Sequence, residues 1–335
     1  MAIFMLDARG REIDYVRISV TDRCNLRCIY CMPEEGLCMT KHEDILTYDE
    51  IRRLCSIFVS LGIKHVKLTG GEPLVRRNVP ELVRNLKELS GIETVTLTTN
   101  GVLLEAMVEE LVQSGIDGVN VSLDTLNEEE YTRMTRVNAL SSVQRGIDKI
   151  LSYGIPVKIN CVTIKHKDSN SEDRKAELLQ IAELAKNRKL DIRFIELMPI
   201  GLGKEYDFIR EEEIKVLLTE QFGALQPCGE RLGSGPSHYY SLEGFCGRIG
   251  FISAMSHQFC ESCNRIRLTA QGYLKTCLQY HTGVDARELL RNQNVDDDMI
   301  ADVIRQAINE KPEGHHFSEC DIRHEERDCM SQIGG

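Results

Sequence analysis

The sequence predicts an α/β fold in which six strand–helix units share one sheet and a C-terminal extension follows. Two observations support this fold class. Strand-like and helix-like segments alternate over about the first 200 residues, and such alternation implies parallel strands with right-handed helical crossovers. Beyond about residue 205 the alternation stops and glycine-rich, short β-like segments replace it. Six units suit either an incomplete (βα)6 barrel of the TIM type or an open doubly wound sheet.

Each element follows from local pattern, taken in chain order. Strands are expected at residues 15–20, 65–69, 93–99, 118–123, 156–164 and 190–198. Helices are expected at residues 47–61, 79–90, 103–114, 127–135 and 142–152, and after the charged stretch 165–175 up to about residue 187. Thr47 suits an N-cap and Gly62 a helix stop. The boundary near residue 210 divides the chain into a barrel, 1–210, and a C-terminal segment, 211–335. In the latter, 209–221 and 285–310 look helical and the tail looks irregular and mobile.

Composition excludes several classes of protein. The 335 residues are 42 % apolar and 28 % charged, as is usual for globular chains. A net charge of −11 argues against bulk binding to nucleic acid or to an anionic membrane, although it allows a local basic pocket. No run approaches the roughly 20 apolar residues of a membrane-spanning helix, and the N-terminus does not resemble a targeting signal. A cytoplasmic protein is expected.

Thirteen cysteines stand out. In a reducing compartment such residues are more often metal ligands, catalytic groups or buried side chains than disulfides. Seven of the cysteines stand apart from any metal-site spacing and are interpreted as having no metal-binding role. Among them, Cys55 and Cys161 lie in apolar runs typical of a core. The two triplets have metal-site spacing and consist of Cys24, Cys28 and Cys31, and of Cys260, Cys263 and Cys277.

The first triplet, in CNLRCIYC, follows the first strand, at the end of the sheet where barrels place their chemistry. Three cysteines are one short of a closed tetrahedral zinc site, although Cys38 or His42 could supply a fourth ligand. A ferredoxin-type electron carrier is a second possibility, but such clusters usually have four thiolates. Neither reading accounts for the strand–helix scaffold or for the glycine-rich turn TGGEP at the end of the second strand.

CNLRCIYC resembles the cysteine loop of the radical S-adenosylmethionine (SAM) superfamily, and TGGEP resembles its SAM-binding glycine motif. The resemblance implies a [4Fe–4S] cluster on the three cysteines whose open iron is bound by SAM, and an incomplete barrel as the fold. Reduction of the cluster then cleaves SAM to a 5′-deoxyadenosyl radical. By the same resemblance, the SAM-binding residues are Tyr30, Gly71, Ser122 and Met198.

The second triplet also leaves one ligand missing. A zinc ribbon completed by His257 or His281 is one reading, and a second [4Fe–4S] cluster with an open iron is another. Arg265 and Arg267 follow directly, and alternate residues of an extended segment face the same way. Two guanidinium groups beside a cluster suit a phosphate-bearing substrate.

Nearly the whole chain resembles the GTP 3′,8-cyclase family, which begins molybdenum-cofactor biosynthesis. The matching segments include RISVTDRCNLRCIYCMPEEG, LTGGEP, RFIELMP, SGPSHYY, CNRIRLT and the terminal Gly334-Gly335. The resemblance implies that the second cluster engages the guanine of GTP and that the C-terminal glycines reach the active site. It also implies GTP contacts from Arg17, Lys67, Thr98, Lys158, Arg265 and Arg267. Lys67 stands where the family has arginine, so it keeps the charge without the bidentate fork.

The implied reaction needs no catalytic protein side chain. The adenosyl radical abstracts hydrogen from C3′ of GTP, C3′ adds to C8 of the guanine, and a reduction gives 3′,8-cyclo-7,8-dihydro-GTP. The implied cofactors are SAM and two [4Fe–4S] clusters. The implied partners are GTP, a reducing electron donor, a second copy of the chain in a homodimer, and a downstream cyclic pyranopterin monophosphate synthase that receives the product.

Three other functions compete with this reading. A radical SAM peptide-modifying enzyme with an auxiliary cluster would need a peptide-binding module, and no stretch suggests one. A zinc-binding interaction protein would differ in metal content. A ubiquitin-like sulfur carrier shares the Gly-Gly end, but such carriers are small β-grasp domains, unlike this chain of 335 residues.

Overall fold

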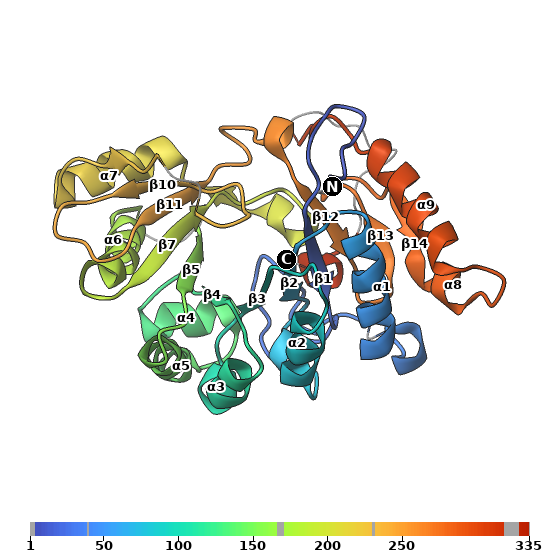
Figure 1. The fold of residues 1–335 in the computed structure, drawn as a ribbon. Coiled ribbons are helices and arrows are strands. Elements are labelled where there is room, and N and C mark those ends of the chain that lie inside the picture. The colour runs from blue at the N-terminus through green and yellow to red at the C-terminus, as the bar shows by residue number, and fades with distance from the viewer. Residues whose placement is uncertain (1–3, 39, 166–170, 230–231, 318–327, 335) are drawn as a thin grey trace.

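A computed structural model describes residues 4–38, 40–165, 171–229, 232–317 and 328–334. Its centre is one 12-stranded sheet in the order β14-β13-β12-β1-β2-β3-β4-β5-β7-β11-β10-β9, with a separate two-stranded sheet of β6 and β8. The sheet curves around an inner face, and the helices α1 to α7 lie along its outer side (Figure 1). The incomplete barrel predicted from the sequence is confirmed.

The six predicted barrel strands are all present and pair in parallel, in chain order. They are β1 (Tyr15–Ser19), β2 (His65–Thr69), β3 (Thr94–Thr99), β4 (Gly118–Ser122), β5 (Val157–Val162) and β7 (Leu190–Ile195). The helices between them are α1 (Tyr48–Ser60), α2 (Val79–Lys87), α3 (Leu104–Gln113), α4 (Glu128–Thr135), α5 (Leu140–Ser152) and α6 (Ser171–Asn187). Of the charged stretch 165–175, residues 166–170 lie outside the described part, and most of the rest begins α6.

Local chemistry explains these boundaries. Thr47 caps α1 in a capping box, because its hydroxyl accepts from the Glu50 amide at 3.2 Å and its amide donates to the Glu50 carboxylate at 2.7 Å. The helix stops before Gly62, which has φ +93°. Within β1, Val16 and Ile18 belong to the main hydrophobic core beneath the helices. The period of two therefore turns the alternate side chains, including Arg17, toward the inner face.

The C-terminal segment is not a separate layer, because it extends the barrel sheet at both edges. β11 (Ile249–Ile252) pairs in parallel with β7, and β12 (Arg265–Leu268) pairs in parallel with β1. The remaining C-terminal elements are β9 (Gln226–Pro227), β10 (His238–Ser241), β13 (Tyr273–Lys275), β14 (Gly283–Asp285), α7 (Glu211–Phe222), α8 (Ala286–Arg291), α9 (Asp297–Asn309) and α10 (Met330–Ile333). The division at 210/211 stays a prediction, while the strands on its two sides share one sheet.

Two sequence predictions for the C-terminal part need correction. The helix expected over 285–310 is two helices, α8 and α9, each with its own aspartate N-cap, Asp285 and Asp296. The tail, expected to be irregular, ends in the short helix α10, in which Ser331 and Ile333 are 2 % and 1 % exposed. Gly335 and residues 318–327 lie outside the described part.

Short connecting elements complete the chain. They are β6 (Ile164–Lys165), β8 (Asp207–Phe208) and the 3-10 turns η1 (His42–Asp44), η2 (Pro73–Val75), η3 (Gly201–Glu205) and η4 (Cys260–Ser262). The predicted core cysteines Cys55 and Cys161 are fully buried, as expected. In the described part of the chain, no helix has the length and apolar character needed to cross a membrane.

Candidate active site

The inner face of the barrel encloses a cavity of about 520 Å³. Elements from both parts of the chain line it, because β11 and β12 flank the barrel strands. Every site residue predicted from the sequence lies on its wall. These are Arg17, Cys24, Cys28, Tyr30, Cys31, Lys67, Gly71, Thr98, Ser122, Lys158, Met198, Cys260, Cys263, Arg265, Arg267 and Cys277.

Strand register places several cations side by side on this wall. Arg17 on β1 pairs in register with Lys67 on β2 and with Arg267 on β12. Tyr15, two residues earlier, pairs with Arg265. Since in-register neighbours on parallel strands point to the same face, the guanidinium and ammonium groups share one side of the cavity.

We call the cations Arg17, Lys67, Arg265 and Arg267 the cation wall. Burial makes it costly to keep several of them charged. The pKa values of Arg17, Lys67 and Arg267 are all lowered, chiefly because burial penalises the charged form and also because neighbouring cations repel it. The lowering is large for Lys67 and Arg267. Behind them, the pKa of Lys275 falls to about 8 through burial and the charge of Arg267. The wall is therefore suited to a ligand carrying several negative charges.

Arg193 on β7 is a cation that the sequence analysis missed. It lines the cavity, is 7 % exposed, and pairs in register with Asn160 on β5. Its Nε has no hydrogen-bond partner among the described residues. An arginine between the apolar residues Ile192 and Phe194 of the strand LDIRFI was the signal that could have identified it, because a buried unpaired donor is costly without a ligand.

Lys158 joins the barrel to the loop that precedes β10. Its Nζ donates to the backbone oxygen of Leu232 at 3.1 Å and lies 5.3 Å from the centre of the Tyr239 ring. Loop residues 232–237 line the cavity. The lysine therefore helps to hold this loop at the wall of the site.

The glycine turn after β2 packs directly on the chain that leads into the first cysteine triplet. The amide of Gly71 donates to Thr21 O at 2.8 Å, and the amide of Glu72 donates to Arg23 O at 2.8 Å. A Cβ on Gly71 would lie 2.4 Å from Arg23 O, and one on Gly70 would lie 2.4 Å from Thr21 O. Only glycine permits this approach, so the turn and the cysteine loop form one unit.

Glu72 holds that unit to β3. Its fully buried carboxylate accepts from Leu74 N at 2.9 Å, Thr99 Oγ1 at 2.7 Å and Asn100 N at 2.6 Å. Burial raises its pKa to about 7, although these hydrogen bonds oppose the shift. Asn100 in turn donates to Asn25 Oδ1 at 2.8 Å, inside the cysteine loop. The TGGEP motif indicated the glycine turn but not this role of its glutamate.

The first triplet lies in a setting that favours neutral thiols while no metal is bound. Burial raises the pKa of Cys24, raises that of Cys28 strongly, and raises that of Cys31 to about 12. The neighbouring Tyr30 donates its hydroxyl to Asp124 Oδ2 at 2.8 Å, which fixes its ring at the cavity wall. A metal cation bound by the three cysteines would stabilise their thiolates, because its positive charge lowers the thiol pKa values that burial raises.

The second triplet differs, because one thiol is activated. Burial alone would raise the pKa of Cys263, but Arg265 and Lys311 outweigh it and bring the pKa to about 6. The guanidinium carbon of Arg265 lies 5.0 Å from the centre of the Phe259 ring. Nearby, the backbone amide of His315 points to Cys260 Sγ at 3.4 Å. Lys311 and His315 both line the cavity, and the sequence analysis had not singled out either.

The donor sets fit iron–sulfur clusters. Each triplet offers three thiols at the wall of one cavity, and thiolates are the usual ligands of iron in such clusters. Of the histidines considered for zinc, His257 lies 3.8 Å from Glu211, the His281 ring stacks on Tyr273 at 5.0 Å between centroids, and His42 is exposed. Cys38 is exposed.

The C-terminal tail enters the same site. Arg267 Nη1 donates to the backbone oxygen of Gly334 at 2.7 Å. Met330 and Ser331 line the cavity. A Cβ on Gly334 would lie 3.0 Å from Ser19 Cβ and 3.2 Å from Thr69 Cγ2, and its φ is +79°. Both facts favour glycine at this position.

Comparison with known families agrees with this architecture. Residues 18–179 match the Radical SAM superfamily. Residues 190–317 match the family described as Molybdenum Cofactor Synthesis C. The two matches together cover the barrel strands and most of the C-terminal segment.

Curated relatives match along the whole chain. The GTP 3′,8-cyclase of Clostridium perfringens (strain SM101 / Type A) is 44 % identical over 331 residues, covering 99 % of this chain and 100 % of the relative. That of Heliobacterium modesticaldum is 42 % identical over 335 residues, with the same coverage. Among solved structures, Streptococcus suis SuiB bound to S-adenosylmethionine matches with a TM-score of 0.58 at 15 % identity, covering 97 % of this chain and 77 % of that one. The similarity to SuiB shows the fold alone.

Proposed function

The chain belongs to the GTP 3′,8-cyclase family of radical SAM enzymes, and from this membership we propose which of its residues serve the reaction. The enzyme converts GTP to (8S)-3′,8-cyclo-7,8-dihydroguanosine 5′-triphosphate, the first step of molybdenum-cofactor biosynthesis. Its cofactors are SAM and two [4Fe–4S] clusters. One observation supports the assignment of residues: both cysteine triplets and the buried cations line a single cavity.

The first cluster is assigned to Cys24, Cys28 and Cys31. When bound, this cluster and SAM supply the 5′-deoxyadenosyl radical that begins the reaction. The backbone of Gly71 is assigned to the methionine end of SAM. The close approach of the glycine turn to the cysteine loop supports this assignment. Tyr30, Ser122 and Met198 line the same cavity and are assigned to the remainder of SAM.

The second cluster is assigned to Cys260, Cys263 and Cys277. The low pKa of Cys263 supports this assignment, because metal binding requires the thiolate. The cluster's missing fourth ligand leaves a place for the guanine of GTP. The C-terminal position of this triplet, beside β12, puts it next to the cation wall.

The triphosphate of GTP is assigned to the cation wall. Arg17, Arg265 and Arg267 provide guanidinium forks that suit phosphate oxygens. Arg193, with its unpartnered Nε among the described residues, joins this set. Thr98, Lys158 and Lys67 also line the cavity. Lys67 pairs in register with Arg17, which supports a contact of Lys67 with the same phosphate groups.

The protein's part in the reaction is positioning. The cation wall and the second triplet fix the two ends of the nucleotide, so that C3′ is held toward the SAM end of the cavity. Loop residues 232–237 and the tail residues Met330 and Ser331 close the wall and exclude water from reactive species. No protein side chain is assigned an acid–base or nucleophilic role.

Domain and partner assignments rest on the same family membership. Residues 1–210 are proposed as the radical SAM barrel, and 211–335 as the segment with the second cluster and the Gly-Gly tail. A homodimer, a reducing electron donor, hand-over of the product to cyclic pyranopterin monophosphate synthase and a cytoplasmic location complete the proposal. The alternative of a peptide-modifying radical SAM enzyme is not favoured, because the full-length relatives are GTP 3′,8-cyclases.

Anaerobic reconstitution tests the residue assignments. The protein is incubated with SAM, dithionite and GTP, and 5′-deoxyadenosine and the cyclised nucleotide are measured by mass spectrometry. Iron content should be about eight per chain, as two [4Fe–4S] clusters require. Replacing GTP by a peptide substrate should give no modified peptide. A chain holding zinc and no iron, or one that modifies peptides and not GTP, would contradict the proposal.

A further inference from the structure

A buried ion pair lies in the N-terminal hairpin, ahead of both family matches, which cover residues 18–179 and 190–317. Leu6 and Glu12 form an isolated antiparallel bridge, and inside this hairpin Asp7 and Arg11 are 6 % and 7 % exposed. Arg11 Nε donates to Asp7 Oδ2 at 2.5 Å. Such a buried pair is costly to form and needs further hydrogen bonds to be sustained.

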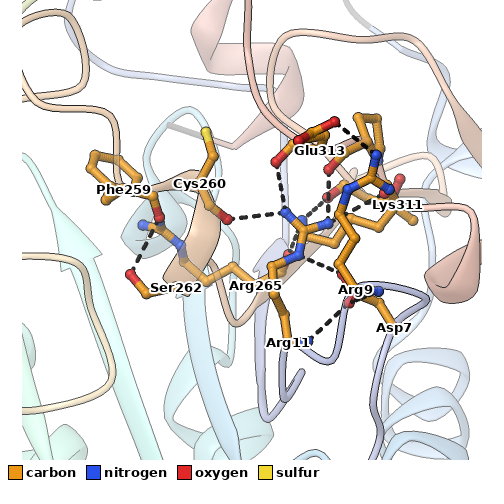
Figure 2. A network of polar contacts seen from close by, with 11 residues as sticks. Asp7, Arg9, Arg11, Phe259, Cys260, Ser262, Arg265, Lys311 and Glu313 are labelled. Atoms are coloured by element: carbon orange, nitrogen blue, oxygen red, sulfur yellow. Dashed lines mark hydrogen bonds and ion pairs between the residues drawn. The ribbon is translucent and has the colours of Figure 1, made fainter.

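The guanidinium of Arg11 directs its other donors to backbone oxygens of two distant segments (Figure 2). One segment is the loop of the second cysteine triplet, and the other is the chain that follows α9. The accepting oxygens belong to Cys260 at 3.0 Å, Lys311 at 3.2 Å, Pro312 at 2.8 Å and Glu313 at 3.0 Å. Arg11 therefore binds the N-terminal hairpin, the Cys260 turn and residues 311–313 into one unit.

The segment that Arg11 holds is itself packed on the second triplet. Lys311 Nζ donates to Arg265 O at 2.9 Å, and its charge lowers the pKa of Cys263. The amide of His315 points to Cys260 Sγ at 3.4 Å. At Gly314, a Cβ would lie 3.4 Å from Cys260 Cβ and 3.6 Å from its Sγ. Segment 311–315 thus packs directly against the Cys260 side chain.

We propose that Arg11, neutralised by Asp7, is a positioning residue for the second iron–sulfur cluster. By fixing the carbonyl of Cys260 and segment 311–315 together, it keeps the three thiolates in the arrangement that retains the cluster. The proposal rests on the proposed function, which assigns Cys260, Cys263 and Cys277 to that cluster. It adds the N-terminal hairpin, remote in sequence, to the active-site structure.

Arginine is specifically suited to this position. Its planar fork presents several donors in fixed directions, so one side chain reaches oxygens of both segments. Lysine carries the same charge, but its donors radiate from one nitrogen, so it cannot span the four carbonyl oxygens that the guanidinium reaches. Groups that orient a metal ligand from behind typically alter metal affinity or activity by about 10- to 100-fold when they are replaced.

The test uses Arg11→Lys and a matched control on the same hairpin, Arg9→Lys. The Arg9 side chain forms an exposed ion pair with the Glu313 carboxylate at 2.9 Å, with side-chain exposures of 46 % and 79 %, and such pairs contribute little. Both changes are made in two full-length backgrounds. One is the otherwise unchanged enzyme. The other has the first triplet replaced by alanine (Cys24→Ala, Cys28→Ala, Cys31→Ala), so that only the second cluster remains.

In the alanine background, iron release to a chelator and the EPR spectrum of the reduced cluster, with and without GTP, are measured. Arg11→Lys should release iron about 10- to 100-fold faster than the background and should change the GTP-induced EPR shift. Arg9→Lys should match the background in both measurements. In the otherwise unchanged enzyme, Arg11→Lys should still cleave SAM without substrate, which shows that the fold and the first cluster are intact, while GTP cyclisation falls.

Four results would overturn the proposal, and they differ in what else fails. Iron release and EPR spectra unchanged by Arg11→Lys would leave the cluster assignment intact and dismiss Arg11. Equal effects from Arg9→Lys and Arg11→Lys, or loss of SAM cleavage in Arg11→Lys, would make Arg11 a general support of the fold. An alanine background that holds no iron would overturn the assignment of the second triplet itself, and the role of Arg11 with it.

Discussion

Arg17 and Arg267 occupy paired positions on the adjacent parallel strands β1 and β12, although 250 positions separate them in the sequence. Burial lowers the pKa of both guanidinium groups, and the charge of Arg17 lowers that of Arg267 further. Two like charges held side by side in the interior are unfavourable in the free enzyme. A bound triphosphate offsets this repulsion, so part of the affinity for GTP arises from relief of the repulsion between the cations.

Replacing Arg267 by alanine should weaken GTP binding by roughly tenfold to a hundredfold. The loss of one hydrogen bond to a charged group typically costs about 1.5–3 kcal/mol, which corresponds to that range. Isothermal titration under anaerobic conditions measures the Kd, with iron content as a check. Arg267→Lys should recover only part of the loss. Guanosine, which lacks phosphates, should barely respond, and an equal loss for guanosine and GTP would contradict the phosphate assignment.

Replacing Cys260 by alanine should remove about half of the iron, because one of two clusters is lost. SAM cleavage without substrate should persist, since it depends on the other triplet, while GTP cyclisation should stop. Cys28→Ala is the matched comparison and should do the opposite, abolishing SAM cleavage while leaving the second cluster. Iron analysis and measurement of 5′-deoxyadenosine distinguish the two. A fully active Cys260→Ala enzyme would show that the second triplet is structural.

Removing Gly334 and Gly335 should leave both clusters in place and reduce cyclisation. The oxygen of Gly334 accepts from Arg267 at 2.7 Å, so the tail shares a donor with the proposed triphosphate site. Turnover of GTP and uncoupled SAM cleavage are measured for the truncated and complete chains. As a control, Val216, which is 58 % exposed on α7 and does not line the cavity, is replaced by alanine. Cyclisation at the full rate without the two glycines would contradict a role for the tail.

Glu211 should make stability depend on pH in the acid range. This buried carboxylate accepts from His238 at 2.7 Å and also contacts Lys215 and Ser253. Burial opposes its charge, but these partners outweigh burial and lower its pKa from 4.5 to about 2. Its charged form therefore stabilises the fold fully above about pH 4.5, and this contribution disappears as the pH falls toward 2.

A shift of this size corresponds to about 3 kcal/mol at neutral pH. Urea unfolding of the enzyme and of Glu211→Gln, followed between pH 7 and pH 3, measures it. The two curves should differ most at pH 7 and converge as acid is added. The exposed neighbour Glu212, replaced by glutamine, provides the control and should change stability little. A constant difference at every pH would assign the effect to packing and not to charge.

Local sequence pattern was sufficient for the strands and helices of the barrel, whereas most site residues were assigned from the resemblance to known families and stay predictions. Strand β1 could be predicted because its apolar and polar residues alternate, and the capping box at Thr47 marked the start of α1. The spacing of the cysteines indicated a metal site and TGGEP a close backbone turn, while the radical SAM chemistry was inferred from the family resemblance. These are properties of short segments, in which neighbouring residues determine one another's conformation.

Pairing between distant segments could not be predicted from such patterns. Nothing local to RIRL indicates that it lies beside β1, or that IGFI lies beside β7. The burial of Arg193 and the reach of Arg11 to Cys260 follow from those pairings. Local pattern alone also made the tail look irregular, whereas the resemblance to the cyclase family had placed its glycines at the active site, where Gly334 O accepts from Arg267.

The pairing of β12 with β1 also determines when the enzyme can mature during its synthesis. β1 is made first, yet one of its edges has no partner until residues 265–268 have left the ribosome. Strands with an unpaired edge invite association with other chains, and pairings of such long sequence separation form slowly. Nascent chains therefore pass through a state in which the first cysteine loop exists but the cavity wall does not. The second triplet itself lies in the last third of the polypeptide, so its cluster can be held only once Cys277 has been made. Chains cut short before residue 265 should aggregate rather than accumulate as partly folded enzymes.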